Sequence, residues 1–158
     1  MQKVLLALLT AAVSYLLGCF STGITLSNAQ GVDIRKFGSH NTGASNMLRV
    51  LGTKSGLLTF LGDCLKATLA CLLGSLLLPG VTFGIDRFGT MLGGLCAVLG
   101  HNWPVFYHFK GGKGVACSVA VLVFVDPALG LISIALCLAV IAITRYISAG
   151  SMVMLLSY

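Results

Sequence analysis

Long apolar runs, each bounded by a short polar segment, make up most of the chain. The first run covers residues 4–27, and three more cover residues 56–78, 89–106 and 128–144. Each approaches the roughly 20 apolar residues with which an α-helix crosses a bilayer. This pattern predicts an all-α fold, a polytopic integral membrane helical bundle whose helices are joined by short loops.

Two further apolar segments are too short to cross a membrane as ideal helices. Residues 115–125 form one of them and end before Asp126-Pro127; residues 152–156 form the other. We expect the first to be a half-helix, either extended through the preceding glycine turn or backed by protein. The chain is thus predicted to form one domain, residues 1–158, with about five or six membrane segments, some of them short or broken.

The composition excludes other classes of protein. Hydrophobic residues make up 57% of the 158 residues and charged residues 9%, whereas soluble domains carry about 25% charged residues. Soluble, disordered and coiled-coil folds are therefore excluded, as is a large extramembrane domain. The six cysteines lie in apolar stretches without a C-x-x-C pair, so we interpret them as buried thiols and expect no metal site.

The basic residues indicate how the chain is oriented. The net charge is +6, but no basic stripe alternates with aromatic residues, which argues against nucleic-acid binding. If the loops alternate sides, one face receives Arg35, Lys36, Arg49, Lys54, Lys110, Lys113 and Arg145, and the other only Lys3 and Arg87. The positive-inside rule then places three polar segments in the cytoplasm and the N-terminus outside. Lys66 lies inside an apolar run with Asp63 at i,i+3, and we expect the two charges to neutralise each other.

The first polar segment, residues 28–55, concentrates glycines and hydrogen-bonding side chains between Gly38 and Asn46. Such a loop leads into a helix predicted to start near Thr42, and helix N-termini present free N–H groups and positive potential to anions. Arg49 follows Asn46 at i,i+3 and would act as a bidentate clamp. The segment is either a phosphate cradle or a polar connector that caps the next helix.

The second polar segment reads FKGGKG over residues 109–114. Glycines around Lys113 at the start of an apolar helix favour backbone N–H groups and one ammonium directed at an anion. It is not a Walker A loop, because Gly114 stands where that motif has a hydroxyl. The alternative is a basic turn whose lysines snorkel to the membrane face.

Two other polar positions are ambiguous from sequence. His101 is a base, a substrate contact or a satisfied packing group, and packing is favoured. Ser148, in the third polar segment at residues 145–151, either caps the last helix or holds a substrate. The sequence shows no Ser-His-Asp order, paired carboxylates or metal-ligand set.

These segments together resemble one family. SYLLG at residues 14–18, GVDIRKFGSHNTGASNMLRVLG, Asp63-x-x-Lys66, GHNWPVFYHFKGGKGVA and RYIS follow in order over nearly the whole chain. The ordered set resembles the bacterial membrane glycerol-3-phosphate acyltransferases that use acyl phosphate as donor. The resemblance implies seven helices in the bacterial inner (cell) membrane, with three cytoplasmic motifs. It implies acyl transfer from acyl phosphate to the 1-hydroxyl of sn-glycerol 3-phosphate, which yields lysophosphatidic acid and phosphate for phospholipid synthesis. No cofactor or metal is expected.

The resemblance also implies roles for particular residues. Ser39 and Arg49 match an essential pair and, with Lys113 and Ser148, make up the expected catalytic set. The expected substrate-binding residues are Asn41, Ser45, Asn46, His101, Gly111, Gly112 and Gly114. His40 stands where glycine is common in the family, and Ser45 where threonine is common.

The family continues through two more helices that carry a functional histidine and asparagine. The chain is therefore expected to lack the family's C-terminal helices and last motif. Two other interpretations stay open: a small transporter or binding protein for phosphorylated solutes, and a non-catalytic subunit or gene fragment. A transporter often carries an inverted repeat, and none is evident here.

Overall fold

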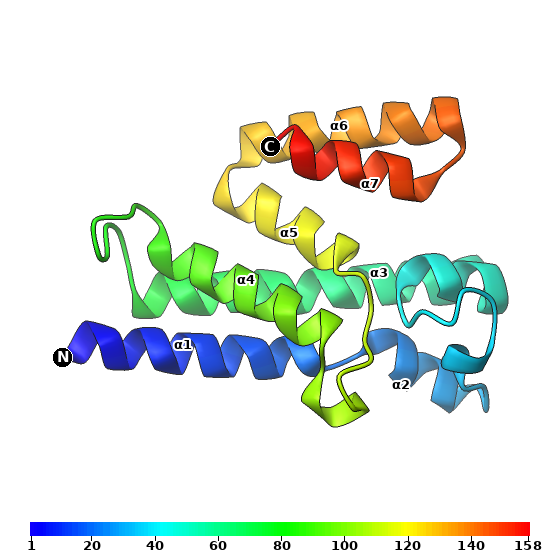
Figure 1. The fold of residues 1–158 in the computed structure, drawn as a ribbon, viewed down its shortest axis with the longest axis horizontal. Coiled ribbons are helices and arrows are strands. Elements are labelled where there is room, and N and C mark those ends of the chain that lie inside the picture. The colour runs from blue at the N-terminus through cyan, green and yellow to red at the C-terminus, as the bar shows by residue number, and fades with distance from the viewer.

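The computed structural model describes residues 1–158 as an assembly of helices (Figure 1). The prediction of an all-α fold is confirmed. The α-helices are α1 (Gln2–Cys19), α2 (Thr22–Ala29), α3 (Ala44–Leu77), α4 (Phe88–Asn102), α5 (Val115–Val125), α6 (Pro127–Thr144) and α7 (Ile147–Leu156), and two short 3-10 helices are η1 (Ile34–Lys36) and η2 (Val105–Tyr107).

Three stretches are long and apolar enough to cross a membrane. They are Gln2–Ala29, Ala44–Leu77 and Pro127–Thr144, and α5 and α7 are shorter apolar helices. Large apolar side chains such as Leu5, Leu8 and Leu16 on α1 are exposed. A hydrocarbon environment can cover such side chains, so the helices meet the expectation of several membrane segments.

Helices α1, α3 and α4 pack against one another, α5 lies on α3 and α4, and the α6–α7 hairpin lies on α5 (Figure 1). Glycines allow the first three to approach closely. A Cβ atom at Gly93 would lie 2.2 Å from the carbonyl oxygen of Ala70, and one at Gly18 would lie 2.2 Å from that of Ala97. The helices therefore touch backbone to backbone, as small residues permit in membrane bundles.

The prediction of one continuous helix over residues 4–27 is wrong. The chain is extended at Phe20 (φ −67°, ψ 122°), and Ser21 begins α2 by accepting a hydrogen bond from the Ile24 N–H at 3.3 Å. The Lys66 ammonium donates to the carbonyl oxygens of Gly18 at 2.9 Å and Phe20 at 2.6 Å. A charge distant in the sequence thus binds carbonyls next to the break, where the regular helical pairing has ended.

The second apolar helix also differs from its prediction, because α3 begins at Ala44 instead of residue 56. It is interrupted at Gly52, whose φ of 82° and ψ of 177° are not helical. The first part packs back on the second, since a Cβ at Gly56 would lie 2.7 Å from Leu48 Cβ. Because this first part contains many polar residues, it falls within the polar segment predicted over residues 28–55.

Helix α5 spans residues 115–125 as predicted and is backed by protein. The Cys64 thiol donates to the Ala116 carbonyl at 3.3 Å, and the Cys117 thiol donates to the Asp63 carbonyl at 3.4 Å. The glycine turn before α5 does not extend the helix, because Gly114 has a left-handed φ of 75°. This arrangement fixes the start of α5 beside the middle of α3.

The polar segments gather at one end of the bundle. The α2–α3 loop, the α4–α5 loop and the α6–α7 turn lie toward the right in Figure 1, whereas the N-terminus, the α3–α4 loop and the α5–α6 turn lie toward the left. This is the alternation of loops that the sequence predicted. The right-hand end therefore carries nearly all of the candidate functional residues.

Candidate functional site

The first candidate loop, residues 33–46, is organised around the buried side chain of Asn46. Its Oδ1 accepts from the Ser39 N–H at 2.9 Å. Its Nδ2 donates to the carbonyl oxygens of Asn41 at 2.8 Å, Phe37 at 3.0 Å and Ile34 at 3.4 Å. One amide therefore holds four backbone groups of the loop together.

The side chain of Asn41 also hydrogen-bonds to the backbone of the loop. Its Oδ1 accepts from the Gly43 N–H at 2.8 Å, and Gly43 is the residue that begins α3. The polar atoms of Asn46 and the Oδ1 of Asn41 therefore bind the loop itself and give it its shape. The resemblance implies that the two side chains contact the substrate, whereas the structure shows them bound to the backbone of the loop.

Three candidates in this segment remain free. Ser39, Ser45 and Arg49 are exposed, and their side chains make no hydrogen bond or ion pair within the chain. The N–H groups of Ala44 and Ser45 lack a carbonyl partner in the first turn of α3. A guanidinium, two hydroxyls and a helix N-terminus are together available to an anion.

The second candidate loop, residues 109–114, lies against the end of α4. The Gly111 N–H donates to the Asn102 carbonyl at 3.2 Å, and the Gly112 N–H donates to the His101 carbonyl at 3.0 Å. These two N–H groups are therefore engaged within the chain, and the backbone donors expected of this loop are left to its other residues. The last carbonyls of a helix need partners, and these glycines supply them.

No side chain fits at these glycines. A Cβ at Gly111 would lie 2.0 Å from the His101 carbonyl oxygen, and a Cβ at Gly112 would lie 1.9 Å from Nε2 of the His101 ring. The glycines in this motif are thus required by contact with α4. The N–H groups left without carbonyl partners run from the end of the loop into the first turn of α5, at Lys113, Gly114, Val115, Ala116 and Cys117.

Lys113 and Asn102 complete this part of the site. Lys113 is exposed just before α5. Asn102 Oδ1 is buried without a hydrogen-bond partner and would lie 2.7 Å from a Cβ at Gly114. Sequence reasoning missed Asn102, although a polar amide directly after His101 at the end of an apolar helix was an available signal.

A buried charged cluster lies behind the second loop. Lys66 Nζ lies 3.1 Å from Asp63 Oδ1 and 2.9 Å from His101 Nδ1. All three residues are buried. The predicted Asp63–Lys66 neutralisation is confirmed. His101 packs in the interior with Nδ1 bound to Lys66, as the packing interpretation expected, and its Nε2 makes no hydrogen bond within the chain.

The cluster is not a metal site. Ligand atoms of Asp63, His101 and Cys117 lie within 4.8 Å of one another. The Lys66 ammonium, however, lies against both the Asp63 carboxylate and His101 Nδ1. A cation cannot share those atoms with an ammonium without strong repulsion, so this donor set does not fit a metal ion.

Ser148 lies apart from the two loops. It is exposed in the first turn of α7, on the hairpin that packs on α5, and its hydroxyl has no partner. Tyr146, and not Ser148, occupies the capping position of α7. The structure therefore brings Ser148 to the same end of the bundle without placing it in contact with the other candidates.

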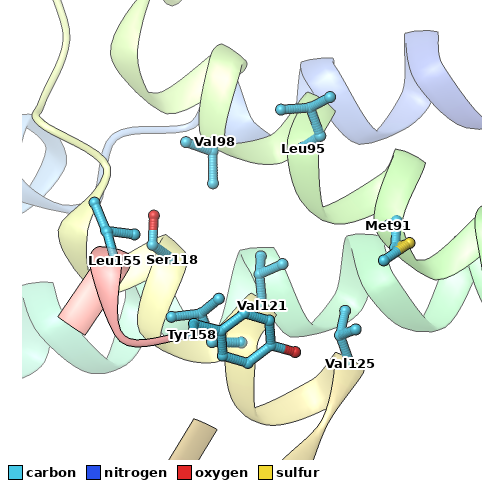
Figure 2. A pocket seen from close by; sticks show the side chains of 9 residues that line it. Met91, Leu95, Val98, Ser118, Val121, Val125, Leu155 and Tyr158 are labelled. Carbon is cyan, nitrogen blue, oxygen red and sulfur yellow. The ribbon is translucent and has the colours of Figure 1, made fainter. Parts of the chain in front are cut away.

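An apolar cavity of about 260 Å³ lies between α4, α5 and the end of α7 (Figure 2). Ser118 is the one polar residue in its lining, and it stands one turn from the start of α5. The remaining lining residues are Met91, Leu95, Val98, Val121, Leu122, Val125, Leu155 and Tyr158. The cavity thus runs from the neighbourhood of the second loop along α5.

One ion pair lies on the loop surface. Arg35 donates to both carboxylate oxygens of Asp33, at 2.9 and 3.2 Å. The Arg35 guanidinium lowers the pKa of Asp33 through this hydrogen bond. Asp33 also caps η1 by accepting from the Arg35 N–H. The pair stabilises the entrance to the first loop.

Comparison with known proteins supplies independent evidence. A family model described as glycerol-3-phosphate acyltransferase matches residues 8–158. A protein of that name from Thermoanaerobacter pseudethanolicus is 45% identical over 146 residues, which cover 92% of this chain and 70% of the relative. Another, from Aquifex aeolicus, is 41% identical over 145 residues, covering 92% of this chain and 73% of the relative.

Solved structures agree with the sequence comparison. The fold is similar to a crystal structure of PlsY, an integral membrane glycerol 3-phosphate acyltransferase, in its glycerol 3-phosphate form. The TM-score is 0.86 at 40% identity, over 96% of this chain and 73% of the other. The lysophosphatidic acid form gives a TM-score of 0.83 at 39% identity, over 96% and 72% of the two chains.

Proposed function

The chain belongs to the glycerol-3-phosphate acyltransferase family, and we propose that it transfers a fatty acyl group from an acyl phosphate to the 1-hydroxyl of glycerol 3-phosphate. The products are lysophosphatidic acid and inorganic phosphate. Relatives solved with glycerol 3-phosphate and with lysophosphatidic acid support the acceptor and the product. Being an integral membrane protein, the enzyme meets its lipid product within the bilayer.

One observation carries the proposal. The two loops lie at the same end of the bundle, and each leads into a helix N-terminus (Figure 1). Lys113 is exposed in the second loop, and Arg49 is exposed in the second turn of α3, after the first loop. Both substrates carry a phosphate, so a site for this reaction must hold two anions close together. Two basic helix N-termini at one end supply a place for each of the two anions.

The chemistry needs orientation more than activation. The glycerol hydroxyl oxygen attacks the acyl carbon, the bond from that carbon to the phosphate oxygen breaks, and the departing phosphate takes the hydroxyl proton. Lys113 and the free N–H groups of α5 stabilise the charge on the donor phosphate. Arg49 and Ser39 hold the acceptor, with Ser45 and Ser148 as further contacts. Holding both reactants in line supplies much of the rate enhancement.

The glycines and buried amides have supporting roles in this scheme. Gly111, Gly112 and Gly114 let the second loop lie on α4, and Asn41 and Asn46 shape the first loop. The acyl chain lies in the apolar cavity along α5 (Figure 2). The cavity begins near Ser118, one turn inside the helix whose N-terminus receives the phosphate, so the mixed anhydride spans the boundary between loop and bilayer.

We further propose that the polar loops face the cytoplasm of a bacterial inner membrane, with the N-terminus outside. The excess of lysine and arginine on the loop end supports this orientation. Cysteine labelling checks it: a maleimide that cannot cross membranes should label Ser39→Cys only in inverted vesicles. The control is Asp86→Cys, on the opposite loop, which should be labelled only in right-side-out vesicles.

The activity is tested with purified protein, radiolabelled glycerol 3-phosphate and palmitoyl phosphate. Labelled lysophosphatidic acid should form, and Arg49→Ala or Lys113→Ala should reduce it about 100-fold or more, as for the loss of one preorganised donor. Lys110→Ala, in the same loop, is the matched control and should retain activity. Uptake of label into liposomes without product would instead support a transporter.

A second arm uses a fusion of this chain with the part of the Thermoanaerobacter relative that the match does not cover. Product from the fusion alone would show that the transfer needs that part. No product from either folded chain would contradict the proposed function.

A further inference from the structure

We infer that Lys66 is a positioning residue for the acyl transfer, which fixes the proton of His101 on Nε2, the ring nitrogen that faces Gly112 of the second loop. This inference rests on the proposed function for its effect on catalysis. The position of the proton can be measured without any substrate.

The Lys66 ammonium has three hydrogen-bond acceptors within reach. Its Nζ lies 2.9 Å from the Gly18 carbonyl oxygen, 2.6 Å from the Phe20 carbonyl oxygen and 2.9 Å from His101 Nδ1. An ammonium has three protons and no lone pair. The three contacts therefore use all three protons, and Asp63 Oδ1 at 3.1 Å supplies the compensating negative charge.

These contacts determine which ring nitrogen of His101 carries the proton. Two carbonyl oxygens can only accept, so the third proton of Lys66 goes to His101 Nδ1, which must accept through its lone pair. The other acceptor near Nδ1, Asp63 Oδ1, is 3.5 Å away and too distant for a strong hydrogen bond. The ring proton is consequently left to Nε2.

The protonated nitrogen, Nε2, lies against Gly112 of the second loop. A Cβ atom at Gly112 would be 1.9 Å from Nε2, so this nitrogen is in contact with the backbone of the second loop. The His101 carbonyl oxygen accepts from the Gly112 N–H at 3.0 Å. The same residue thus holds the loop through its backbone and presents an N–H to it through its ring.

The consequence is a fixed donor beside a loop that binds an anion. Without Lys66 the proton could occupy either ring nitrogen, and the ring could turn toward the Asp63 carboxylate. Lys66 removes this freedom although it is buried and lies behind the loop. It acts through His101, and its loss should weaken binding of a phosphate substrate more than it slows the chemical step.

Nitrogen NMR of protein labelled with ¹⁵N-histidine tests the tautomer. The chain has three histidines, so His40→Gln and His108→Gln variants assign the other two signals. The expected result for His101 is an unprotonated Nδ1 and a protonated Nε2. In Asp63→Asn/Lys66→Met, which removes both buried charges together, His101 should show a mixture of tautomers. A proton on Nδ1 in the unaltered protein would overturn the inference.

Kinetics test the positioning role. Asp63→Asn/Lys66→Met should raise KM for glycerol 3-phosphate, or for acyl phosphate, by about 10- to 100-fold, the range for losing a hydrogen bond to a charged group, with a smaller change in kcat. Lys3→Met/Asp86→Asn, which removes one exposed charge of each sign at the other end of the bundle, is the matched control and should change neither KM nor tautomer.

A rescue separates positioning from mere stability. His101→Gln carries an amide donor near the position of Nε2 that does not depend on Lys66, so adding Asp63→Asn/Lys66→Met to it should cause little further loss. An equal loss in both backgrounds would overturn the positioning role. The unaltered protein with the expected tautomer but no acyl transfer would contradict the proposed function while supporting the position of the proton.

Discussion

The two candidate loops carry the same kinds of residue but are held in opposite ways. In the first, the Asn46 side chain fills the interior of the loop and hydrogen-bonds to four backbone groups. In the second, Gly111 and Gly112 lack side chains, and the end of α4 occupies the space that side chains would take. One loop depends on a polar side chain, and the other depends on having none.

This difference shows why a glycine-rich sequence does not by itself reveal free backbone donors. A glycine brings its own N–H close to another part of the protein as readily as to a ligand. In the second loop the partner is the carbonyl end of α4. Under the proposed function, anion binding there falls to Lys113 and to the unpaired N–H groups of residues 113–117, whereas in the first segment Ser39, Ser45 and Arg49 remain exposed.

Among substitutions at residues that shape the two loops, Gly112→Ala should have the largest effect. The added Cβ would lie 1.9 Å from His101 Nε2, so the loop or the ring must move by an ångström or more. A displacement of this size costs about 100-fold in rate, measured as kcat/KM for acyl transfer. Gly80→Ala, in the α3–α4 loop, is the control: its Cβ would meet nothing within 4 Å, and its left-handed φ of 63° should cost stability but not acyl transfer. Equal activity of the two variants would mean that the contact with α4 is not required.

Asn46→Asp should have the next largest effect, since it keeps the shape of the side chain. The Nδ2 donors are lost and a carboxylate oxygen faces three carbonyl oxygens, so the loop should open. We expect faster hydrogen exchange across residues 34–41 and about tenfold lower kcat/KM, equivalent to about 1.4 kcal/mol. Asn28→Asp, at an exposed position, is the isosteric control. Unchanged exchange in Asn46→Asp would contradict the central role of this amide.

A smaller effect distinguishes two substitutions of His40, which has a left-handed φ of 56°. His40→Gly should leave thermal stability nearly unchanged, because relief of this conformation offsets the greater freedom of glycine when unfolded. A β-branched residue is strongly disfavoured there, so His40→Val should destabilise the protein by about 1–2 kcal/mol. Denaturation in detergent measures both. Equal stability of the two would argue against the left-handed turn.

The smallest effect concerns Asp33. The Arg35 hydrogen bond lowers the pKa of Asp33, so folding favours the carboxylate form. This stabilisation is fully present above the usual carboxyl pKa of about 3.9 and is lost as the pH falls through the lowered value. The protection of the first loop against hydrogen exchange, corrected for the intrinsic pH dependence of amide exchange, should therefore be insensitive to this group near neutral pH and should fall only in acid. Asp33→Asn should remove the acid-dependent part.

The sequence predicted local features well. Residues 115–125 form α5 within the predicted bounds, and the i,i+3 spacing of Asp63 and Lys66 correctly indicated an ion pair. Three polar segments lie at one end of the bundle, as the alternation of loops required. In each case the information lies within a few residues or in a simple periodicity.

Features that depend on distant partners were not predictable from the same patterns. At the break between α1 and α2, the Phe20 carbonyl accepts a hydrogen bond from Lys66, which is 46 residues away in the sequence. The burial of Asn46 follows from carbonyls that a loop presents only once it has folded. The loss of Gly111 and Gly112 as free donors depends on where α4 ends. Spacing along the chain contains none of these contacts.

The acceptors of Lys66 have a consequence for how the protein is made. Asp63 lies one turn away on the same helix, so the ion pair can enter the membrane with α3. The Gly18 and Phe20 carbonyls belong to a segment that is synthesised before α3 and leaves the ribosome first. His101 is synthesised later and completes the cluster. The charged helix thus finds most of its partners during synthesis, before the helix that carries His101 arrives.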